Sequence, residues 1–74
     1  MTNKDRIAEG KRLLARCEER IANGKRIQIE AYRERDMEGW WLAKMGVRKN
    51  ETFKARLLAD LEELERKDLN DDFN

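Results

Sequence analysis

Apolar residues recur every seven positions in the first part of the chain, where the segment RIAEGKR at 6–12 returns as RIANGKR at 20–26. Fourteen residues make close to four helical turns, so both copies face the same side of a helix. The second position of the repeat reads Ile7, Leu14 and Ile21, and the fifth reads Gly10, Cys17 and Gly24. A stripe of large apolar residues beside a row of small ones predicts one face of a helical hairpin or coiled coil.

Capping residues mark both ends of this first helix. Thr2 or Asn3 can act as the N-cap, and Asp5 places a negative charge in the first turn, where the helix dipole favours it. Asn23 and Gly24 both tolerate a left-handed backbone, which is typical of helix C-termini. The sequence therefore predicts that the first helix stops near residue 23.

The middle of the chain has a weaker pattern. IQIEAY at 27–32 alternates in part as a strand does, but a single strand has no partner here, so a helix is favoured. The run RERD at 33–36 holds four charged residues and no apolar position. We expect a second helix over 26–45, bent or interrupted near Gly39 and closed by Gly46.

A third helix is predicted after Asn50, a natural N-cap that Glu51 follows. Its apolar residues have the spacing of one helix face, and they are Phe53, Leu57, Leu61 and Leu64. The pattern ends near residue 69, and NDDFN at 70–74 is expected to be a frayed acidic tail.

These elements predict an all-α fold. Helices with short connections form a small three-helix bundle, or a helical hairpin plus a third helix. Residues 1–69 would be a single helical domain. The sequence leaves open whether the first helix packs on its own chain or on a second copy in a homodimer. The expected core is Ile7, Leu14, Cys17, Ile21, Ile27, Trp41, Met45, Phe53, Leu57, Leu61 and Leu64.

Composition argues against an enzyme. The 74 residues include no His, Pro or Ser and only one cysteine, so neither a Ser or Cys triad nor a zinc site can be assembled. The four glycines are scattered and form no phosphate-binding loop. We therefore expect a non-enzymatic protein without a metal or a cofactor.

The chain also lacks the features of a membrane or exported protein. Its longest apolar run, WWLA at 40–43, is too short for a membrane span or a signal peptide. A lone cysteine, Cys17, favours a reducing, cytoplasmic setting. A single core in a chain this short rarely contributes more than about 3–5 kcal/mol, which favours support from oligomerisation or a partner.

Charge is unevenly distributed along the chain. Charged residues make up 45% of the sequence for a net charge of only +1. Residues 1–35 hold ten Lys/Arg against six Asp/Glu, whereas residues 57–74 hold two against seven. Such asymmetry indicates nucleic-acid or partner binding, unless basic and acidic helices face each other within one molecule. The candidate nucleic-acid contacts are Lys11, Arg12, Arg16, Arg20, Lys25, Arg26, Arg48 and Lys49.

Trp40 and Trp41 form the candidate protein-binding site. Neighbouring positions on a helix point about 100° apart, so a small bundle cannot easily bury both indoles. We expect one tryptophan in the core and the other exposed, with Tyr32 and Met37 as neighbours and Arg33 or Arg35 in the same contact surface. The alternative is that both indoles straddle a core edge and their N–H groups reach water. Trp, Tyr and Arg are the residues that dominate protein-binding hot spots. Exposed aromatic rings can also stack on the bases of single-stranded nucleic acid.

Residues 42–57, LAKMGVRKNETFKARL, resemble a helix-turn-helix, with a short helix, a glycine turn and an Asn-capped basic helix. The segment departs from that motif because Ala43 and Gly46 are one residue too close, and because the last helix becomes acidic from Asp60. DNA phosphates repel an acidic helix. The acidic end is either a solubilising tail or an imitation of nucleic-acid phosphates in a partner's basic groove.

The leading interpretation is a small helical binding protein that acts through protein–protein contact. It would regulate or inhibit a larger complex, as small accessory proteins of phages and other mobile elements do. One alternative is a nucleic-acid-binding protein that uses the basic first helix and the turn at 48–56. The other is a structural homo-oligomer that associates through the stripe of Ile, Leu and small residues.

Overall fold

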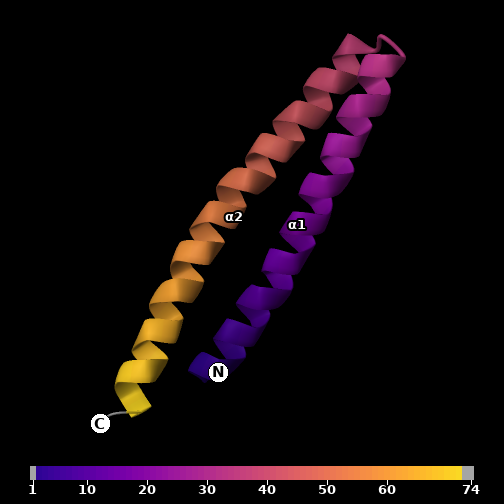
Figure 1. The fold of residues 1–74 in the computed structure, drawn as a ribbon. Helices are drawn as coiled ribbons and strands as arrows, with labels where there is room; N and C mark the ends of the chain where they lie inside the picture. Colours follow the sequence, from indigo (N-terminus) through magenta and orange to yellow (C-terminus); the bar gives the residue numbers. More distant parts are fainter. Residues whose placement is uncertain (1, 73–74) are drawn as a thin grey trace.

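In a computed structural model, the chain forms one antiparallel hairpin of two long helices (Figure 1). Helix α1 spans Asn3–Arg33 and helix α2 spans Met37–Asp72. The structure describes residues 2–72, with side chains as far as residue 67, and it contains no strand in that range. The Cα atoms extend over 59 × 15 × 14 Å, and both termini lie at the end opposite the turn. The all-α class is confirmed, but two helices form where three were predicted.

Helix α1 begins with a capping box. The hydroxyl of Thr2 accepts a hydrogen bond from the backbone N–H of Asp5 at 3.2 Å. The carboxylate of Asp5 accepts one from the backbone N–H of Thr2 at 3.3 Å. These bonds satisfy two donors that the first helical turn leaves free. The predicted stop at Asn23 and Gly24 is wrong, because α1 continues to Arg33.

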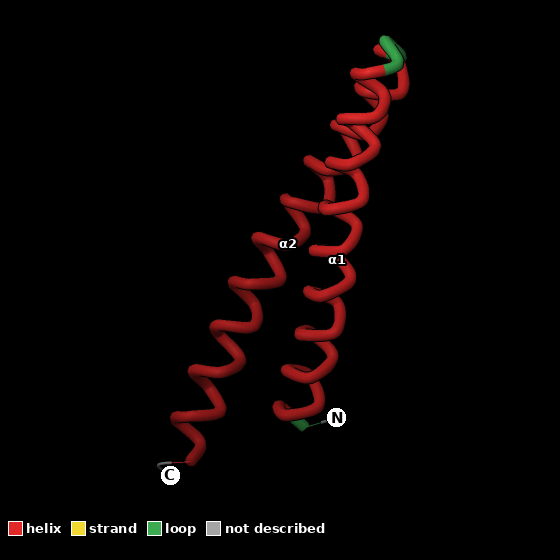
Figure 2. Tube along the Cα trace, turned by 45° about the vertical axis from the view of Figure 1, so that its right-hand side comes forward, coloured by secondary structure: helices red, strands yellow, loops and turns green. Residues whose placement is uncertain are grey.

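The two helices are joined by residues 34–36, which Figure 2 shows as the short green connection. The backbone N–H of Asp36 donates to the carbonyl of Ala31 at 2.8 Å, and that of Arg35 donates to Tyr32 at 3.1 Å. This pair of bonds is a Schellman motif, which ends a helix and satisfies its last carbonyls. Arg35 takes the left-handed position of the motif with a φ of 59°, where glycine is usual. The prediction of a helix through this segment is therefore wrong.

Asp36 starts the second helix. Its Oδ1 accepts a hydrogen bond from the backbone N–H of Gly39 at 3.0 Å, which is the geometry of an N-cap. Helix α2 then runs without interruption through Gly46 and Asn50. Asn50 is not an N-cap, since its side chain donates to the carbonyl of Gly46 at 2.9 Å within the helix. The predicted second helix is divided, since 26–33 belong to α1, and its part from Met37 onward is continuous with the predicted third helix.

The helices meet along a seam with a strict seven-residue repeat. Every residue at the seam positions, which are named at the end of this paragraph, is buried or half-buried, whereas nearly all other described residues are exposed. Such a repeat is the pattern of a two-stranded coiled coil, since seven residues complete nearly two helical turns. The α1 side of the seam consists of Ile7, Gly10, Leu14, Cys17, Ile21, Gly24, Gln28 and Ala31. The α2 side consists of Trp40, Ala43, Val47, Asn50, Lys54, Leu57, Leu61 and Leu64.

Small residues of α1 lie against large residues of α2 along this seam. A Cβ atom on Gly10 would stand 2.5 Å from Leu61 Cδ2, and one on Gly24 would stand 2.5 Å from Val47 Cγ2. Both glycines therefore sit inside a helix because the partner side chain fills the space above them. Packing of this kind outweighs the cost of about 1 kcal/mol for a glycine in a helix, and Gly24 does not end α1.

The core is smaller than the sequence predicts. Of the eleven expected core residues, Cys17, Ile21 and Leu61 are buried, and Ile7, Leu14, Leu57 and Leu64 are half-buried. The other four are wrong, since they are about half exposed or more, and they are Ile27, Trp41, Met45 and Phe53. Two helices can cover only one face of each other, so apolar residues outside the seam stay in solvent. The buried Ala31 and Val47 were not expected.

The predicted acidic tail falls largely outside the described part of the chain. Helix α2 continues to Asp72, so its backbone extends past residue 69. The side chains of 68–74 and the backbone of 73–74 lie outside the described residues.

Candidate protein-binding surface

Large hydrophobic side chains gather on the surface beside the turn. Tyr32 is 68% exposed, and Ile29, Met37 and Trp41 are each about half exposed. Ile29 and Tyr32 come from the end of α1, whereas Met37, Trp40 and Trp41 come from the first turns of α2. The hairpin turn therefore brings apolar residues from two helix ends together. We call Ile29, Tyr32, Met37, Trp40 and Trp41 the tip surface.

A shallow groove between the helices lies at the centre of the tip surface. Its volume is about 520 Å³, and Ile29, Tyr32 and Trp40 supply its apolar lining. The remaining lining residues are Lys25, Gln28 and Arg33, which have polar or charged ends. An apolar hollow with a polar rim is the arrangement of many protein-binding sites.

The two tryptophans extend the groove along α2. Their ring centroids are 5.2 Å apart and their planes are nearly perpendicular, at 87°. The Nζ atom of Lys44 lies 4.9 Å from the Trp40 ring and 5.1 Å from the Trp41 ring. Edge-to-face packing and a cation over both rings restrict the movement of the indoles. A rigid aromatic pair loses little conformational entropy when a partner covers it.

The structure brings together four of the five residues predicted for this site. Trp40, Tyr32 and Arg33 line the groove, and Trp41 packs on Trp40. Arg35 does not line the groove; its role is in the backbone of the turn. The expectation of one core and one exposed tryptophan is only partly met: Trp41, placed in the core from the sequence, is exposed, and Trp40 is half-buried and not part of the buried core.

Sequence reasoning missed Ile29 and Lys44 as members of this site. Ile29 precedes Tyr32 by three residues, so both lie on one side of α1. Lys44 follows Trp40 and Trp41 by four and three residues, the same relation on α2. The spacing therefore held a signal for both residues once the helix boundaries were known.

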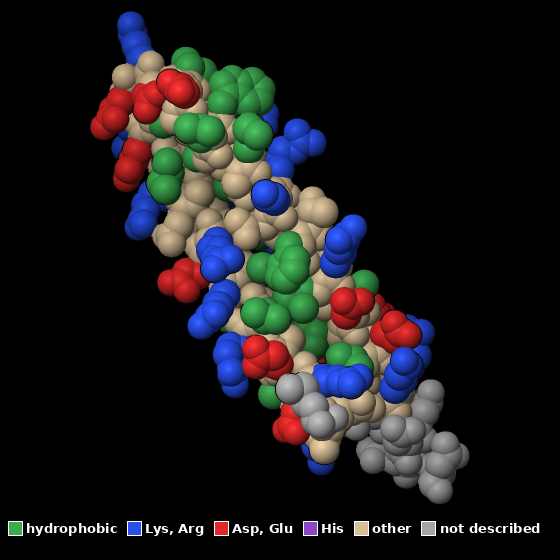
Figure 3. Space-filling model, turned by 180° about the vertical axis from the view of Figure 1, so that it is seen from behind, with side chains coloured by type: hydrophobic (Ala, Val, Ile, Leu, Met, Phe, Trp, Pro, Cys, Tyr) green, Lys and Arg blue, Asp and Glu red, His purple; other side chains and the backbone are tan. Residues whose placement is uncertain are grey.

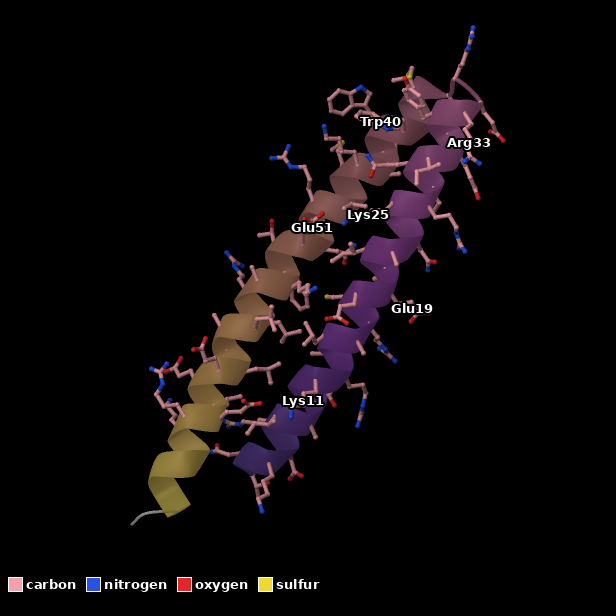
Figure 4. The ribbon with its side chains drawn as sticks, in the orientation of Figure 1. Lys11, Glu19, Lys25, Arg33, Trp40 and Glu51 are labelled. Carbon is pink, nitrogen blue, oxygen red and sulfur yellow. The ribbon has the colours of Figure 1, made fainter. Side chains whose placement is uncertain are left out.

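The predicted nucleic-acid contacts do not form one strip. Lys25 lies in grooves on the side that Figure 4 presents, where Glu51 of α2 faces it across the seam. Glu19 projects from the side of α1 away from α2, and Arg12 and Arg26 share its row because they are seven residues away. The seven-residue repeat places Arg16 and Arg20 on the flank of α1 opposite to the flank that carries Lys25. The basic set of α1 is therefore spread around the helix.

Two of these basic residues of α1, Lys11 and Arg12, form ion pairs. Lys11 Nζ lies 3.7 Å from Glu65 Oε1 across the hairpin, and Arg12 lies 3.1 Å from Glu9 within α1. A second pair across the hairpin joins Glu18 to Lys54 at 3.6 Å. The Lys11–Glu65 ion pair is thus one place where a basic residue of α1 faces an acidic residue of α2, as the uneven charge distribution allowed. All of these side chains are exposed by about a third or more, so each pair contributes little.

A second hollow lies on the face of α2 that points away from α1. Its volume is about 750 Å³, and its lining comes from α2 alone. The lining residues are Met45, Gly46, Arg48, Lys49, Thr52, Phe53 and Arg56, and we call this region the outer groove. It overlaps the segment 42–57 that resembles a helix-turn-helix, but that segment has no turn, because α2 is continuous there. A recognition helix is therefore not formed.

Other kinds of site find no support in the described residues. No three His, Cys, Asp or Glu side chains come close enough together to hold a metal ion within that part of the chain. Neither helix, as far as it is described, has an apolar stretch that could cross a bilayer. No protein-family model, curated protein or solved structure matches the chain. The functional argument therefore depends on the surfaces themselves.

Proposed function

We propose that this chain is a non-enzymatic binding protein that docks on another protein through its tip surface. The observation that carries the proposal is the exposure of Tyr32, Trp41 and Ile29 beside a groove formed by both helices. Large aromatic residues in solvent cost free energy in a protein that works alone. A partner that covers them recovers this cost.

Residue chemistry favours a protein partner at this surface. Trp, Tyr and Arg are enriched in binding hot spots, and Trp41, Tyr32 and Arg33 lie at or beside the groove. Lys25, Gln28 and Lys44 supply polar groups at its edge. Apolar centres with polar rims are typical of protein interfaces, which exclude water from the centre.

The proposal includes a regulatory role for this binding. A hairpin 59 Å long with exposed apolar side chains beside its turn can occupy a groove on a larger assembly. Regulation or inhibition of such an assembly is a role that a small protein can perform by binding alone. Its origin in a phage or another mobile element stays a prediction.

Affinity capture with matched variants tests the proposal. The wild-type chain and a Tyr32→Ala/Trp41→Ala variant are immobilised and exposed to lysate of the source cells. Both side chains are more than half exposed, so their loss leaves the seam intact. We expect a discrete protein that the wild type retains and the variant loses, at equal helicity by circular dichroism.

The matched control is an Arg12→Ala/Glu19→Ala variant, which changes two exposed residues on the side of α1 away from α2. It is expected to retain the same protein. Retention by the tip variant, or loss by the control, would exclude the tip surface as the docking site.

A further inference from the structure

The outer face of α2 has no partner within the hairpin. Met45 is 62% exposed and Phe53 is 48% exposed, although both line one continuous hollow. Figure 3 shows hydrophobic side chains grouped midway along the back of the hairpin, with both basic and acidic side chains around them. This surface is separate from the tip surface, since the two grooves share no lining residue.

Charge is segregated along this face of α2. Arg48, Lys49 and Arg56 line the outer groove, and no acidic residue does. Within the described residues, none of these three cations forms an ion pair. The next two turns of the same helix carry Asp60, Glu62 and Glu63, all exposed. The helix therefore presents a basic segment followed by an acidic one.

The acidic segment is only weakly neutralised. Glu62 pairs with Arg66 at 3.7 Å and Glu63 pairs with Lys67 at 3.6 Å, each one turn further along α2. All four side chains are more than 60% exposed, and such pairs contribute little in water. Both carboxylates are therefore able to accept a second cation.

Gly46 gives an independent indication of a close neighbour on this face. The other three glycines are explained within the chain, because a Cβ atom would meet Leu61 at Gly10, Val47 at Gly24 and Asp36 at Gly39. At Gly46 a Cβ atom would have nothing within 4 Å. A glycine inside a helix is unfavourable without a packing reason, and a helix from outside the chain supplies one.

We propose that a second copy of this chain packs antiparallel along the outer face of α2. A twofold axis near residue 54 sets 45–49 of one copy opposite 59–63 of the other. Arg48 then lies opposite Asp60 of the second copy, Glu62 and Glu63 of that copy lie within about one helical turn of Arg48 and Lys49, and these contacts occur twice. The two Phe53 side chains meet near the axis. Gly46 lies opposite position 62 of the second copy, where the missing side chain of the glycine lets the helices approach.

Charge complementarity selects a second copy over another acidic partner. The chain itself carries an acidic segment, Asp60, Glu62 and Glu63, on the same helix as the basic groove, so an antiparallel copy can set one opposite the other. Each copy also has few apolar residues buried within the hairpin, namely Cys17, Ile21, Ala31, Val47 and Leu61. Chains of this size usually need oligomerisation or another support, and covering Met45 and Phe53 supplies it.

Sedimentation equilibrium of the full chain tests this arrangement. We expect a particle of twice 8.9 kDa at micromolar to millimolar concentration, with dissociation on dilution and at high salt. Arg48→Glu/Lys49→Glu and Glu62→Lys/Glu63→Lys should each weaken the dimer by about tenfold or more. An equal mixture of the two variants should restore it as a heterodimer, because each segment of the all-acidic variant then faces a basic segment of the other, so both sets of charge pairs are complementary.

Two further variants separate this effect from folding and from general charge. Arg12→Glu/Arg26→Glu changes the same charge on the far side of α1 and should leave the dimer unchanged. In Gly46→Leu the added side chain points into open space on the hairpin and replaces a glycine that is unfavourable in a helix, so the melting temperature of the hairpin should rise. The same side chain should weaken the dimer, because it stands between the two copies. Because Gly46→Leu changes no charge, its effect on the dimer tests the interface even if a charge-reversal variant loses helicity.

Four outcomes would overturn the proposal. Three of them are a wild-type chain that stays monomeric throughout, a dimer that survives both charge reversals, and a dimer that Gly46→Leu leaves intact. A monomer whose outer groove binds a different acidic protein or a nucleic acid also overturns it. Since none of these variants changes the tip surface, this proposal and the tip-docking proposal fail independently.

Discussion

Gly10 of α1 lies directly against Leu61 of α2, so that a Cβ atom on the glycine would stand 2.5 Å from Leu61 Cδ2. Atoms in proteins do not approach so closely without a shift of the neighbour. The missing side chain is therefore what allows the two helices to meet at this level. The same relation between Gly24 and Val47 fixes the register in the other half of the seam.

Adding a large side chain at Gly10 should separate the helices there. We expect Gly10→Leu to lower the free energy of unfolding by about 1–3 kcal/mol, because the seam becomes overpacked. A second change, Leu61→Ala, should restore much of this loss by exchanging the large and small positions. Urea denaturation of the two single variants and the double variant measures the coupling. Purely additive losses would contradict the contact between these positions.

The left-handed backbone at Arg35 predicts a stabilising substitution. Non-glycine residues at such a position cost roughly 1–2 kcal/mol, so Arg35→Gly should raise the free energy of unfolding by about 1 kcal/mol. Arg33→Gly is the matched control. Arg33 lies in the last turn of α1, where glycine should cost up to about 1 kcal/mol instead. Thermal unfolding compares the two, and equal effects would show that the turn differs from the one described.

The turn is the element that sequence reasoning placed wrongly, and Arg35 explains why. A hairpin turn is easiest to recognise when glycine takes the left-handed position, and here arginine does. The glycines instead lie inside the helices at Gly10, Gly24 and Gly46, where they resemble helix ends. Asp36 followed by Glu38 did carry an N-cap signal for α2.

The first half of the seam, by contrast, was evident from the repeat. Ile7, Leu14 and Ile21 with Gly10 and Cys17 give the α1 side directly. The α2 side was harder, because Asn50 and Lys54 interrupt its apolar pattern at seam positions. Only the facing helix shows that these residues belong to the seam. The tip surface was found in part, since Trp, Tyr and Arg identify binding sites by residue type alone.

Lys54 occupies a seam position that coiled coils usually give to an apolar residue. Its side chain is 35% exposed and its Nζ lies 3.6 Å from Glu18. A polar residue at such a position lowers stability but restricts the alternative associations. We expect Lys54→Leu to raise the free energy of unfolding by about 1 kcal/mol and to produce larger oligomers. Denaturation and light scattering measure both effects, and a loss of stability would show that the pair with Glu18 matters more.

Nucleic-acid binding should be weak, because the basic residues of α1 are spread around the helix. We expect no binding of labelled single- or double-stranded DNA or RNA at near-physiological salt by fluorescence anisotropy. At low salt, nonspecific binding that disappears steeply with added salt is compatible with scattered surface cations. Micromolar binding that persists at physiological salt would favour the nucleic-acid alternative over protein docking.

Site-specific photocrosslinking tests docking at the tip surface most directly. A benzophenone amino acid replaces Tyr32 in one version of the chain and Glu19, on the side of α1 away from α2, in another. Both positions are exposed, so both versions should keep the hairpin. Irradiation in cells should give one discrete adduct with a different protein from position 32 and none from position 19. No adduct from position 32, or the same adduct from both positions, would contradict the account.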